Sequence, residues 1–286
     1  MNHQTVKLQP GLYFVATPIG SARDITLRAL DILASADVIA AEDTRSMKKL
    51  LEIHGVPLNG RPVLAYHDHS GEGARGKLLG YLEAGKTVAY ASEAGTPLIA
   101  DPGYHLSVTA AEAGHLVTSA PGPSAIITAL SLAGLPTDSF FFAGFLPNAK
   151  KARQTALEAV REVPGTLVFY ESPKRVATMV ADAAEVLGGG RKAAVARELT
   201  KKFEEVLRGS LDELAADLPE RTIKGEIVVL IDRQRGEAAS EDDIEGALKE
   251  ALETLSVRDA SDAIAKAYSI NRRKVYQLAL KLQKAG

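Results

Sequence analysis

The sequence contains no cysteine. Disulfide bridges and thiolate metal sites are therefore excluded, and the absence is typical of a protein that works in a reducing compartment. No apolar run approaches the ~20 residues that a membrane-spanning helix needs. Residues 1–11 (MNHQTVKLQPG) also lack the apolar core behind basic residues that marks a signal peptide. These absences favour a protein of a reducing compartment without a membrane span.

Two phosphate-binding patterns are missing or incomplete, and so is a metal site. No G-x-G-x-x-G follows an expected strand, so a dinucleotide-binding fold of the Rossmann type is not expected. Residues 71–77 (GEGARGK) contain the G-x-x-x-x-G-K part of a nucleotide-binding loop, but Leu78 stands where Ser or Thr would hold Mg²⁺. His67 and His69 have no evident third ligand, whereas catalytic zinc needs three protein ligands. We interpret both histidines as polar loop residues and expect no metal.

Neither sign of charge is in large excess over the whole chain. The 34 basic and 36 acidic residues leave a net charge of −2, which argues weakly against a nucleic-acid partner. Residues 237–255, however, carry seven acids against one lysine, and residues 256–286 carry seven bases against two acids. Such asymmetry indicates a polyanionic partner, with Arg272, Arg273 and Lys274 as candidate contacts. A solvated helix face is the alternative.

The length of 286 residues is sufficient for two α/β domains. Apolar runs typical of strands alternate with helical patterns, which predicts a mostly parallel sheet with helices on both faces. The first strands are expected at residues 11–17, 38–41, 63–66, 87–91 and 116–119. A second set is expected at residues 140–142, 166–170, 192–197, 205–208 and 226–231, with helices near 148–161 and 174–187.

These signals divide the chain into three domains. We expect an N-terminal α/β domain over residues 10–120, a C-terminal α/β domain over 121–235, and a helical basic domain over 240–286. Residues 232–243 are polar and acidic and are interpreted as a linker. The last domain is expected to have helices at 241–255, 259–267 and 271–284, with a turn at Ser269-Ile270. This spacing resembles a helix-turn-helix, and a small helical cap without a nucleic-acid role is the alternative.

Three segments at expected strand ends carry candidate functional residues. Residues 91–105 (ASEAGTPLIADPGYH) form a loop rich in Gly and Pro after an apolar strand. Residues 40–45 (AAEDTR) place two acids and an arginine beyond another strand, where open α/β sheets bind ligands, although Asp43 or Thr44 would also cap the helix that follows. Residues 168–175 (VFYESPKR) place two cations in the first turn of a helix, against its macrodipole, which favours a ligand there.

Eight motifs occur in an order that resembles a known family. They are VATPIG with DITLRAL, AAEDTR, SEAGTPLIADPGYHL, APGPSAIITALSLAGLP, GFLP, FYESPKR, RELTKKFEE and KGEIVVLI. Together, over about residues 10–231, they closely resemble the ribosomal RNA small subunit methyltransferase I family, a branch of the tetrapyrrole methylase superfamily. The resemblance implies two α/β domains with the methyl donor in the cleft between them. It also implies S-adenosylmethionine-dependent methylation of a ribose 2′-hydroxyl, on a cytidine in the decoding region of small-subunit (16S) ribosomal RNA. A homodimer, a cytoplasmic location, no metal and a substrate within the assembled subunit complete the expectation.

The same resemblance implies the residues of the site. For donor binding these are Pro18, Gly95, Thr96, Pro97, Leu98, Ile99, Ser124, Ala125, Tyr170, Leu199, Gly225 and Glu226. The carboxylates Glu93 and Asp43 are candidates to accept the hydroxyl proton, a contribution of order 10²–10⁴-fold at most. Arg45, Lys174 and Arg175 are candidate RNA contacts. Glu93 stands where similar sequences have aspartate, so its reach is one methylene longer, and Ser21 stands in place of a usual asparagine.

Two other functions remain open. A methyltransferase of the same fold would act on a small tetrapyrrole-like substrate, but paired basic residues such as Lys150-Lys151 and Lys201-Lys202 argue against it. A non-catalytic RNA-binding assembly factor would keep the fold without the reaction. Donor binding, followed by methyl incorporation into small subunits and into free RNA, separates these functions.

Overall fold

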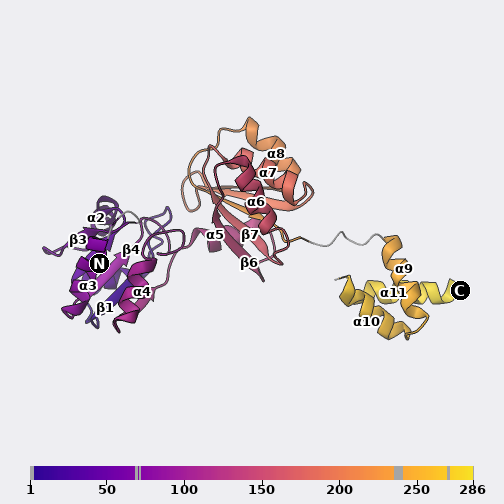
Figure 1. The fold of residues 1–286 in the computed structure, drawn as a ribbon, viewed down its shortest axis with the longest axis horizontal. Helices are drawn as coiled ribbons and strands as arrows, with labels where there is room; N and C mark the ends of the chain where they lie inside the picture. Colours follow the sequence, from indigo (N-terminus) through magenta and orange to yellow (C-terminus); the bar gives the residue numbers. More distant parts are fainter. Residues whose placement is uncertain (1–2, 68–69, 71, 235–240, 269–270, 286) are drawn as a thin grey trace. The chain divides into compact units, whose positions relative to one another are not determined.

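The computed structural model describes residues 3–67, 70, 72–234, 241–268 and 271–285 (Figure 1). The chain forms two compact units, Met1–Arg233 and Gln234–Gly286. The first unit holds two α/β halves, each built on a five-stranded sheet. None of the helices in the described ranges combines the length and the hydropathy that a membrane crossing needs.

The sheet of the first half is entirely parallel, as the sequence predicts. Its strand order is β3-β2-β4-β1-β5. The strands are β1 (Gly11–Val15), β2 (Val38–Ala41), β3 (Val63–Ala65), β4 (Thr87–Ala91) and β5 (Leu116–Ala120). The helices between them are α1 (Leu27–Ser35), α2 (Thr44–Ile53), α3 (Glu72–Glu83) and α4 (Tyr104–Glu112).

Both faces of this sheet are buried. On β1, Tyr13 and Val15 pack in one core with residues of α1 and α2. Leu12 and Phe14 point the other way and pack in a second core with residues of α3 and α4. Because helices cover both faces, β1, β2 and β4 are continuous apolar runs without polar alternation.

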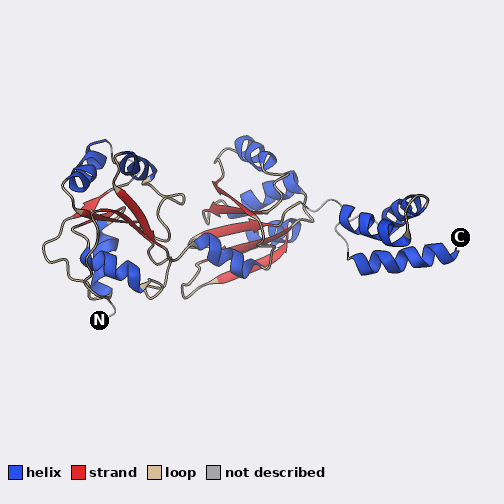
Figure 2. Ribbon diagram, turned by 90° about the horizontal axis from the view of Figure 1, so that it is seen from below, coloured by secondary structure: helices blue, strands red, loops and turns tan. Residues whose placement is uncertain are grey.

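The second half is built from strands with helices packed against them (Figure 2). Its sheet is mixed, in the order β6-β7-β10-β8-β9. Its strands are β6 (Phe140–Phe145), β7 (Thr166–Glu171), β8 (Lys192–Arg197), β9 (Glu205–Ser210) and β10 (Ile227–Ile231). Its helices are α5 (Ala125–Ala133), α6 (Lys150–Ala159), α7 (Val176–Leu187) and α8 (Leu211–Asp217), followed by a 3₁₀ turn at Leu218–Glu220. One core joins the sheet to α6, α7 and α8, and another joins its opposite face to α5.

The prediction of mostly parallel strands does not extend to this sheet. Only β6 and β7 run parallel, and β10 is antiparallel to both β7 and β8. The chain between β8 and β9, Glu198–Glu204, is too short for a parallel crossover, which takes a dozen or more residues, so the two strands pair antiparallel.

The interpretation of residues 232–243 as a linker is wrong at both ends. Asp232 is buried, its backbone N–H donates to the Lys192 carbonyl at 2.8 Å, and its own carbonyl accepts from Arg191. At the other end a helix already begins at Glu241. Composition does not reveal the first of these features, because the hydrogen bonds that hold Asp232 in the fold involve its backbone.

The second unit is a small three-helix domain. It contains α9 (Glu241–Leu252), α10 (Val257–Ala267) and α11 (Arg272–Ala285), which pack around Leu248, Ile264 and Val275. Helix α10 begins two residues before its expected start because Ser256 accepts a hydrogen bond from the Asp259 amide and caps it. The expected turn at Ser269-Ile270 lies outside the described residues.

Candidate active site

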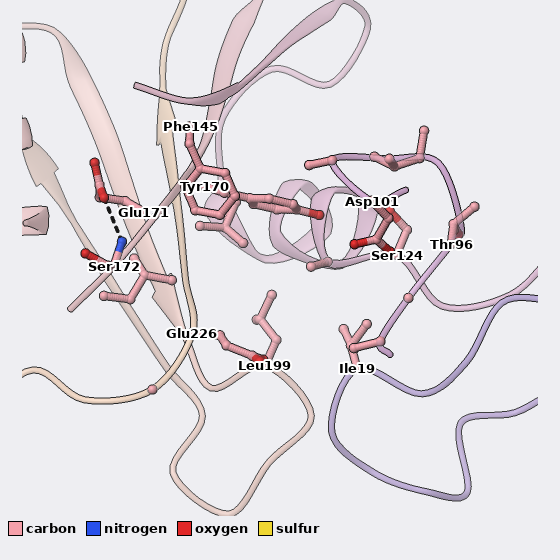
Figure 3. Close-up of a pocket in the computed structure, with 18 of the residues that line it drawn as sticks. Ile19, Thr96, Asp101, Ser124, Phe145, Tyr170, Glu171, Ser172, Leu199 and Glu226 are labelled. Atoms are coloured by element: carbon pink, nitrogen blue, oxygen red, sulfur yellow. Dashed lines mark hydrogen bonds between the residues drawn. The ribbon is translucent and has the colours of Figure 1, made fainter. Parts of the chain in front are cut away.

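A cavity of about 460 Å³ lies between the two halves of the first unit (Figure 3). Its size falls within the range of small-molecule sites, ~300–1,000 Å³. The first half contributes Ile19, Ala94, Gly95, Thr96, Ile99, Ala100 and Asp101. The second half contributes Ser124, Ala125, Phe145, Tyr170, Glu171, Ser172, Pro173, Leu199, Gly225, Glu226, Ile227 and Val228. We call this cavity the donor pocket.

The loop after β4 forms one wall of the donor pocket and is fixed by hydrogen bonds. Gly95 has a φ of +82° and exchanges two backbone hydrogen bonds with Thr17, of 2.9 and 3.0 Å. The Ser92 hydroxyl donates to the Gly95 carbonyl at 2.8 Å, and the Thr96 hydroxyl donates to the Pro123 carbonyl at 2.9 Å. Because the last of these bonds reaches the segment before α5, the loop is held from both halves.

Gly225 and the residues around it form the opposite wall. Gly225 has a φ of +87°, and a Cβ at this position would lie 2.1 Å from Oε1 of Glu198. That carboxylate accepts from the Glu226 amide at 3.1 Å and pairs with Lys201 at 3.0 Å. Lys201 also pairs with Glu226 at 2.9 Å. Only glycine fits the close approach of this wall, because any side chain would displace the Glu198 carboxylate.

The donor pocket combines apolar walls with negative charge. Ile19, Leu199 and Phe145 supply apolar surface. Burial, together with the carboxylates of Asp101 and Glu226, raises the pKa of Tyr170 to about 12. The phenol is therefore protonated at neutral pH and can donate a hydrogen bond. The two carboxylates that raise this pKa also favour a cation in the same space.

Most of the residues expected to bind the donor line this pocket. Pro18, Pro97 and Leu98 do not. Pro18 lines a neighbouring cavity of about 190 Å³. Pro97 is buried, and Leu98 packs beside the core between the sheet and α3–α4. Asp101, Glu171 and Phe145 line the pocket and were not expected from the sequence, although each lies inside one of the quoted motifs.

The two candidate catalytic carboxylates lie outside the donor pocket. Glu93 lines the smaller cavity together with Pro18. Asp43 is the N-cap of α2 and accepts from the amides of Arg45 and Ser46 at 2.7 and 3.3 Å. These hydrogen bonds lower the pKa of Asp43 and make it a weaker base. Of the two expected caps for this helix, the structure selects Asp43 over Thr44.

The three candidate cations of the first unit differ in their surroundings. Arg45 and Lys174 are exposed. The Arg175 guanidinium instead pairs with the buried Glu171 at 3.1 Å, donates to the Leu146 carbonyl at 2.6 Å, and contacts the Asn148 side chain. Arg175 therefore opposes the macrodipole of α7 in order to neutralise a buried carboxylate, and this position needs no ligand to explain it.

Residues 72–77 of the nucleotide-loop pattern are helical. Helix α3 begins at Glu72 and includes both Gly73 and Gly76. A phosphate-binding loop must instead turn its backbone amides toward the phosphates before the helix starts. Within the part of the chain that the structure describes, no cluster of His, Asp and Glu is arranged to hold a metal ion, and His69 lies outside that part.

The chain matches a family model described as Tetrapyrrole (Corrin/Porphyrin) Methylases over residues 11–215. It belongs to the tetrapyrrole methylase family. The second unit matches a model described as RsmI C-terminal HTH domain over residues 238–283. These matches confirm the predicted fold class and the methyltransferase activity.

Similar proteins indicate which branch of the tetrapyrrole methylase family the chain resembles most in sequence. The chain is 45% identical, over 96% of its length and 93% of the relative's, to ribosomal RNA small subunit methyltransferase I of Mesorhizobium japonicum. It is 43% identical to the protein of that name from Escherichia coli O157:H7, over 98% and 99% of the two chains. The fold also resembles uroporphyrin-III C-methyltransferase from Thermus thermophilus in complex with S-adenosyl homocysteine. That likeness has a TM-score of 0.54 and 18% identity, and it covers 78% and 97% of the two chains.

Proposed function

We propose that this chain transfers a methyl group from S-adenosylmethionine to the ribose 2′-hydroxyl of a cytidine in small-subunit (16S) ribosomal RNA. The observation that carries the proposal is the donor pocket, because motifs shared with the rRNA methyltransferase branch converge on it from both halves of the first unit. The names of the relatives support the RNA substrate. The proposal also includes that the cytidine lies in the decoding region and that it is methylated within the assembled small subunit.

The residues of the donor pocket fit the chemistry of S-adenosylmethionine. When bound, this donor supplies a methyl group on a cationic sulfonium. Asp101 and Glu226 provide negative charge toward a cation, and the protonated Tyr170 hydroxyl can serve a polar group of the ligand. Ile19, Ile99 and Leu199 offer apolar surface to the purine and ribose. The pocket contains no basic side chain among its lining residues, which suits a donor without phosphates.

This chain's part in the reaction is mostly alignment. Holding the acceptor hydroxyl in line with the methyl group supplies most of the acceleration, and a carboxylate that accepts its proton adds to it. Glu93 and Asp43 are the proposed bases, and the amides of Arg45 and Ser46 lower the basicity of Asp43. Arg45 and Lys174 are exposed and are proposed to contact phosphates.

A homodimer is part of the proposal. The edge strand β6 exposes Phe140 and Phe141, each 42% accessible, and Ile127 of α5 is 53% accessible. Ile127 and Phe140 line one shallow cavity with Leu130 and Leu135. An apolar surface of this kind on an edge strand is suited to a protein partner. Light scattering on the purified chain tests the dimer.

The activity is tested by offering three acceptors: assembled small subunits, naked small-subunit RNA and a tetrapyrrole. We expect radiolabelled methyl transfer to the RNA acceptors and none to the tetrapyrrole. Alkaline hydrolysis then locates the product, because a 2′-O-methyl group blocks cleavage at that nucleotide whereas a base methyl group does not. Transfer to the tetrapyrrole alone, or donor binding without transfer to any acceptor, would refute the proposal.

A further inference from the structure

The second unit contains a basic groove between α9 and α11, with a volume of about 750 Å³. On α11 it is lined by Arg273, Lys274, Gln277 and Lys281, facing Ile244 and Glu245 of α9. Arg273, Gln277 and Lys281 follow one another at four-residue intervals, so they form one stripe along the helix with steps of ~6 Å. The groove therefore presents a row of exposed cations and an amide along one side.

The groove cations differ from Arg272 and Lys249 of the same unit in their pairing. Arg272, just outside the groove, forms an ion pair with Asp262. Glu245, the acid of the groove, is paired with Lys249 at 2.7 Å. Among the described residues, Arg273, Lys274 and Lys281 form no ion pair with a carboxylate. Their charge is available to an external anion.

We propose that this groove binds the sugar-phosphate backbone of ribosomal RNA, as a second contact separate from the donor pocket. The inference rests on the proposed RNA substrate and adds a binding site to it. Polyanionic RNA suits a groove whose unpaired charges are all positive, because each neutralised phosphate releases condensed counterions. Contacts of this kind fix position and do not read sequence, which matches a groove lined by cations, apolar residues and two side-chain amides, with no aromatic ring in its lining.

The test compares two variants of the full chain. The groove variant carries Arg273→Gln, Lys274→Gln and Lys281→Gln. The control carries Arg258→Gln and Lys266→Gln, which removes positive charge from the same unit but from positions outside the groove lining. Affinity for naked small-subunit RNA is measured at several salt concentrations, and donor affinity is measured by calorimetry.

We expect the groove variant to bind RNA more weakly and to lower the slope of log affinity against log salt by about 2 to 2.7, from ~0.7–0.9 per lost contact. The control variant should keep the slope of the natural chain, and donor affinity should be unchanged in both. Equal slopes for all three proteins, or no RNA binding by the natural chain, would overturn the groove proposal. Weaker binding of the groove variant to assembled subunits alone would also overturn it, because the groove would then bind a protein.

The two failures are distinguishable. If the natural chain binds RNA through the groove but methylates none of the acceptors, the proposed activity is refuted and the groove proposal stands. If both variants methylate small subunits as well as the natural chain does, with equal salt slopes, the activity stands and the groove proposal is refuted.

A separate observation concerns Phe145 at the rim of the donor pocket. Its side chain lines the pocket and yet is 60% exposed. The Phe145 ring packs against the ring of Tyr170. The two ring centres lie 5.6 Å apart, and the rings make an angle of 61°. Figure 3 shows Phe145 beside Tyr170, with Ile19 and Thr96 on the far side of the pocket. The arrangement leaves part of the aromatic ring open to a group that arrives from solvent.

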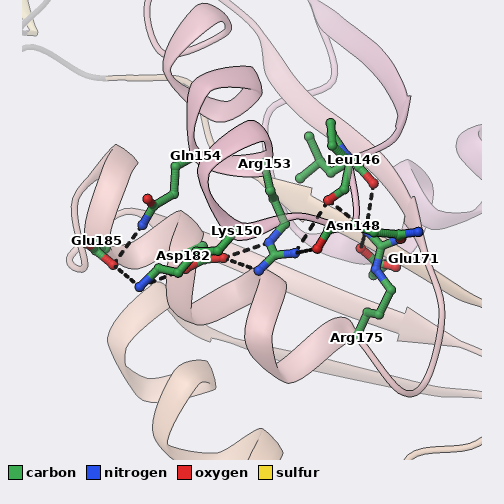
Figure 4. Close-up of polar contacts among 10 residues, drawn as sticks. Leu146, Asn148, Lys150, Arg153, Gln154, Glu171, Arg175, Asp182 and Glu185 are labelled. Atoms are coloured by element: carbon green, nitrogen blue, oxygen red, sulfur yellow. Dashed lines mark hydrogen bonds and ion pairs between the residues drawn. The ribbon is translucent and has the colours of Figure 1, made fainter.

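The backbone on both sides of Phe145 is fixed. Before it, the pairing of β6 with β7 shifts register between Phe142 and Gly144, a bulge that redirects the strand end. After it, Arg175 donates to the Leu146 carbonyl at 2.6 Å and Arg153 donates to the Asn148 carbonyl at 2.8 Å (Figure 4). Arg175 and Arg153, each paired with a buried acid, therefore hold the segment that follows Phe145.

From this geometry we infer that Phe145 stacks against the base of the nucleotide whose ribose is methylated. The ribose that reacts must reach the pocket. The base attached to that ribose must therefore lie close to the rim, where Phe145 is. Unpaired bases stack on exposed aromatic rings, a contact worth ~1–3 kcal/mol per base. The inference rests on the proposed RNA substrate and assigns a recognition residue to it.

The test uses Phe145→Ala, Phe145→Leu and Phe145→Tyr, with Phe203→Ala, a similarly exposed phenylalanine outside the pocket lining, as a control. At saturating donor, Phe145→Ala should raise KM for small subunits by about 5- to 150-fold, from ~1–3 kcal/mol of stacking, and Phe203→Ala should leave it unchanged. Tyrosine should restore KM and leucine should not, because leucine fills space without a ring. An unchanged KM for the Phe145→Ala variant in an active enzyme, or full rescue by leucine, would each overturn the stacking role alone.

Discussion

The buried pair of Arg153 and Asp182 gives a quantitative prediction about the second half. Both side chains are at most 5% exposed, and the Asp182 carboxylate accepts from Nε at 2.7 Å and lies 2.5 Å from Nη2. Asp182→Ala would leave the guanidinium buried without its counter-ion, because the Pro147 and Asn148 carbonyls that remain carry no full charge. Removing one partner of such a pair costs ~3–5 kcal/mol.

The same reasoning predicts strong non-additivity. Replacing both members by apolar residues, Arg153→Met with Asp182→Leu, removes the uncompensated charge and should cost far less, about 0–1 kcal/mol. Denaturant unfolding measures the unfolding free energies of the natural chain, the Asp182→Ala variant and the double variant. The melting temperature of the Asp182→Ala variant should fall by roughly 6–20 °C, at ~2–4 °C per kcal/mol for a unit of this size.

A matched control is available on the same helix. Glu185 pairs with Lys150 at 3.2 Å, but both side chains are more than half exposed, so Glu185→Ala should cost below ~1 kcal/mol. Asp182→Ala with a cost as small as that of Glu185→Ala would refute the reasoning. So would a double variant that loses as much stability as Asp182→Ala.

Three further predictions concern the first unit. Gly95→Val should abolish donor binding in calorimetry while the protein stays folded, because valine disfavours the φ of +82° and its Cβ would lie 3.4 Å from Ile19; near-normal affinity would remove this loop from the site. Lys77→Ala should leave methyl transfer unchanged, and the natural chain should hydrolyse no ATP, since residues 72–77 are helical; magnesium-dependent hydrolysis would contradict this. The pKa of Tyr170 is raised from 10.0 to about 12, so its contribution to stability is complete below pH 10 and is lost as pH rises through 12. Tyr170→Phe should therefore lose less stability than the natural chain between pH 10 and 12 in denaturant titrations, and identical pH profiles would exclude the shift.

The sequence predicts the parallel sheet and the donor loop because both depend on local patterns. Strands buried on both faces must be apolar throughout, and a loop that approaches a ligand needs Gly and Pro, so β4 and residues 91–105 are visible without coordinates. The antiparallel pairing of the second sheet was missed because strand direction depends on how connections cross the sheet. For β8 and β9 the direction follows from the Glu198–Glu204 connection, which is too short for a parallel crossover.

The chemical roles of neighbouring residues were harder to predict. Leu98 and Ile99 are adjacent in the loop, but Leu98, with a φ of +73°, packs beside the core while Ile99 lines the pocket. A sequence motif names both and cannot say which one turns inward. Arg175 is likewise predicted as an RNA contact, and the sequence does not reveal that it pairs with the buried Glu171. Pairing across a turn is a property of the folded chain.

The chain passes between the two halves of the first unit only once, through the residues that follow β5. A ligand in the donor pocket would contact both halves and so add a second, reversible link between two sheets that are joined by one stretch of chain. By mass action such a link raises the unfolding free energy by ~2.7 kcal/mol when the ligand is at one hundred times its dissociation constant, which is ~5–11 °C in melting temperature at this size. Heating the protein in the presence of candidate small molecules would thus rank its ligands before any nucleic acid is added.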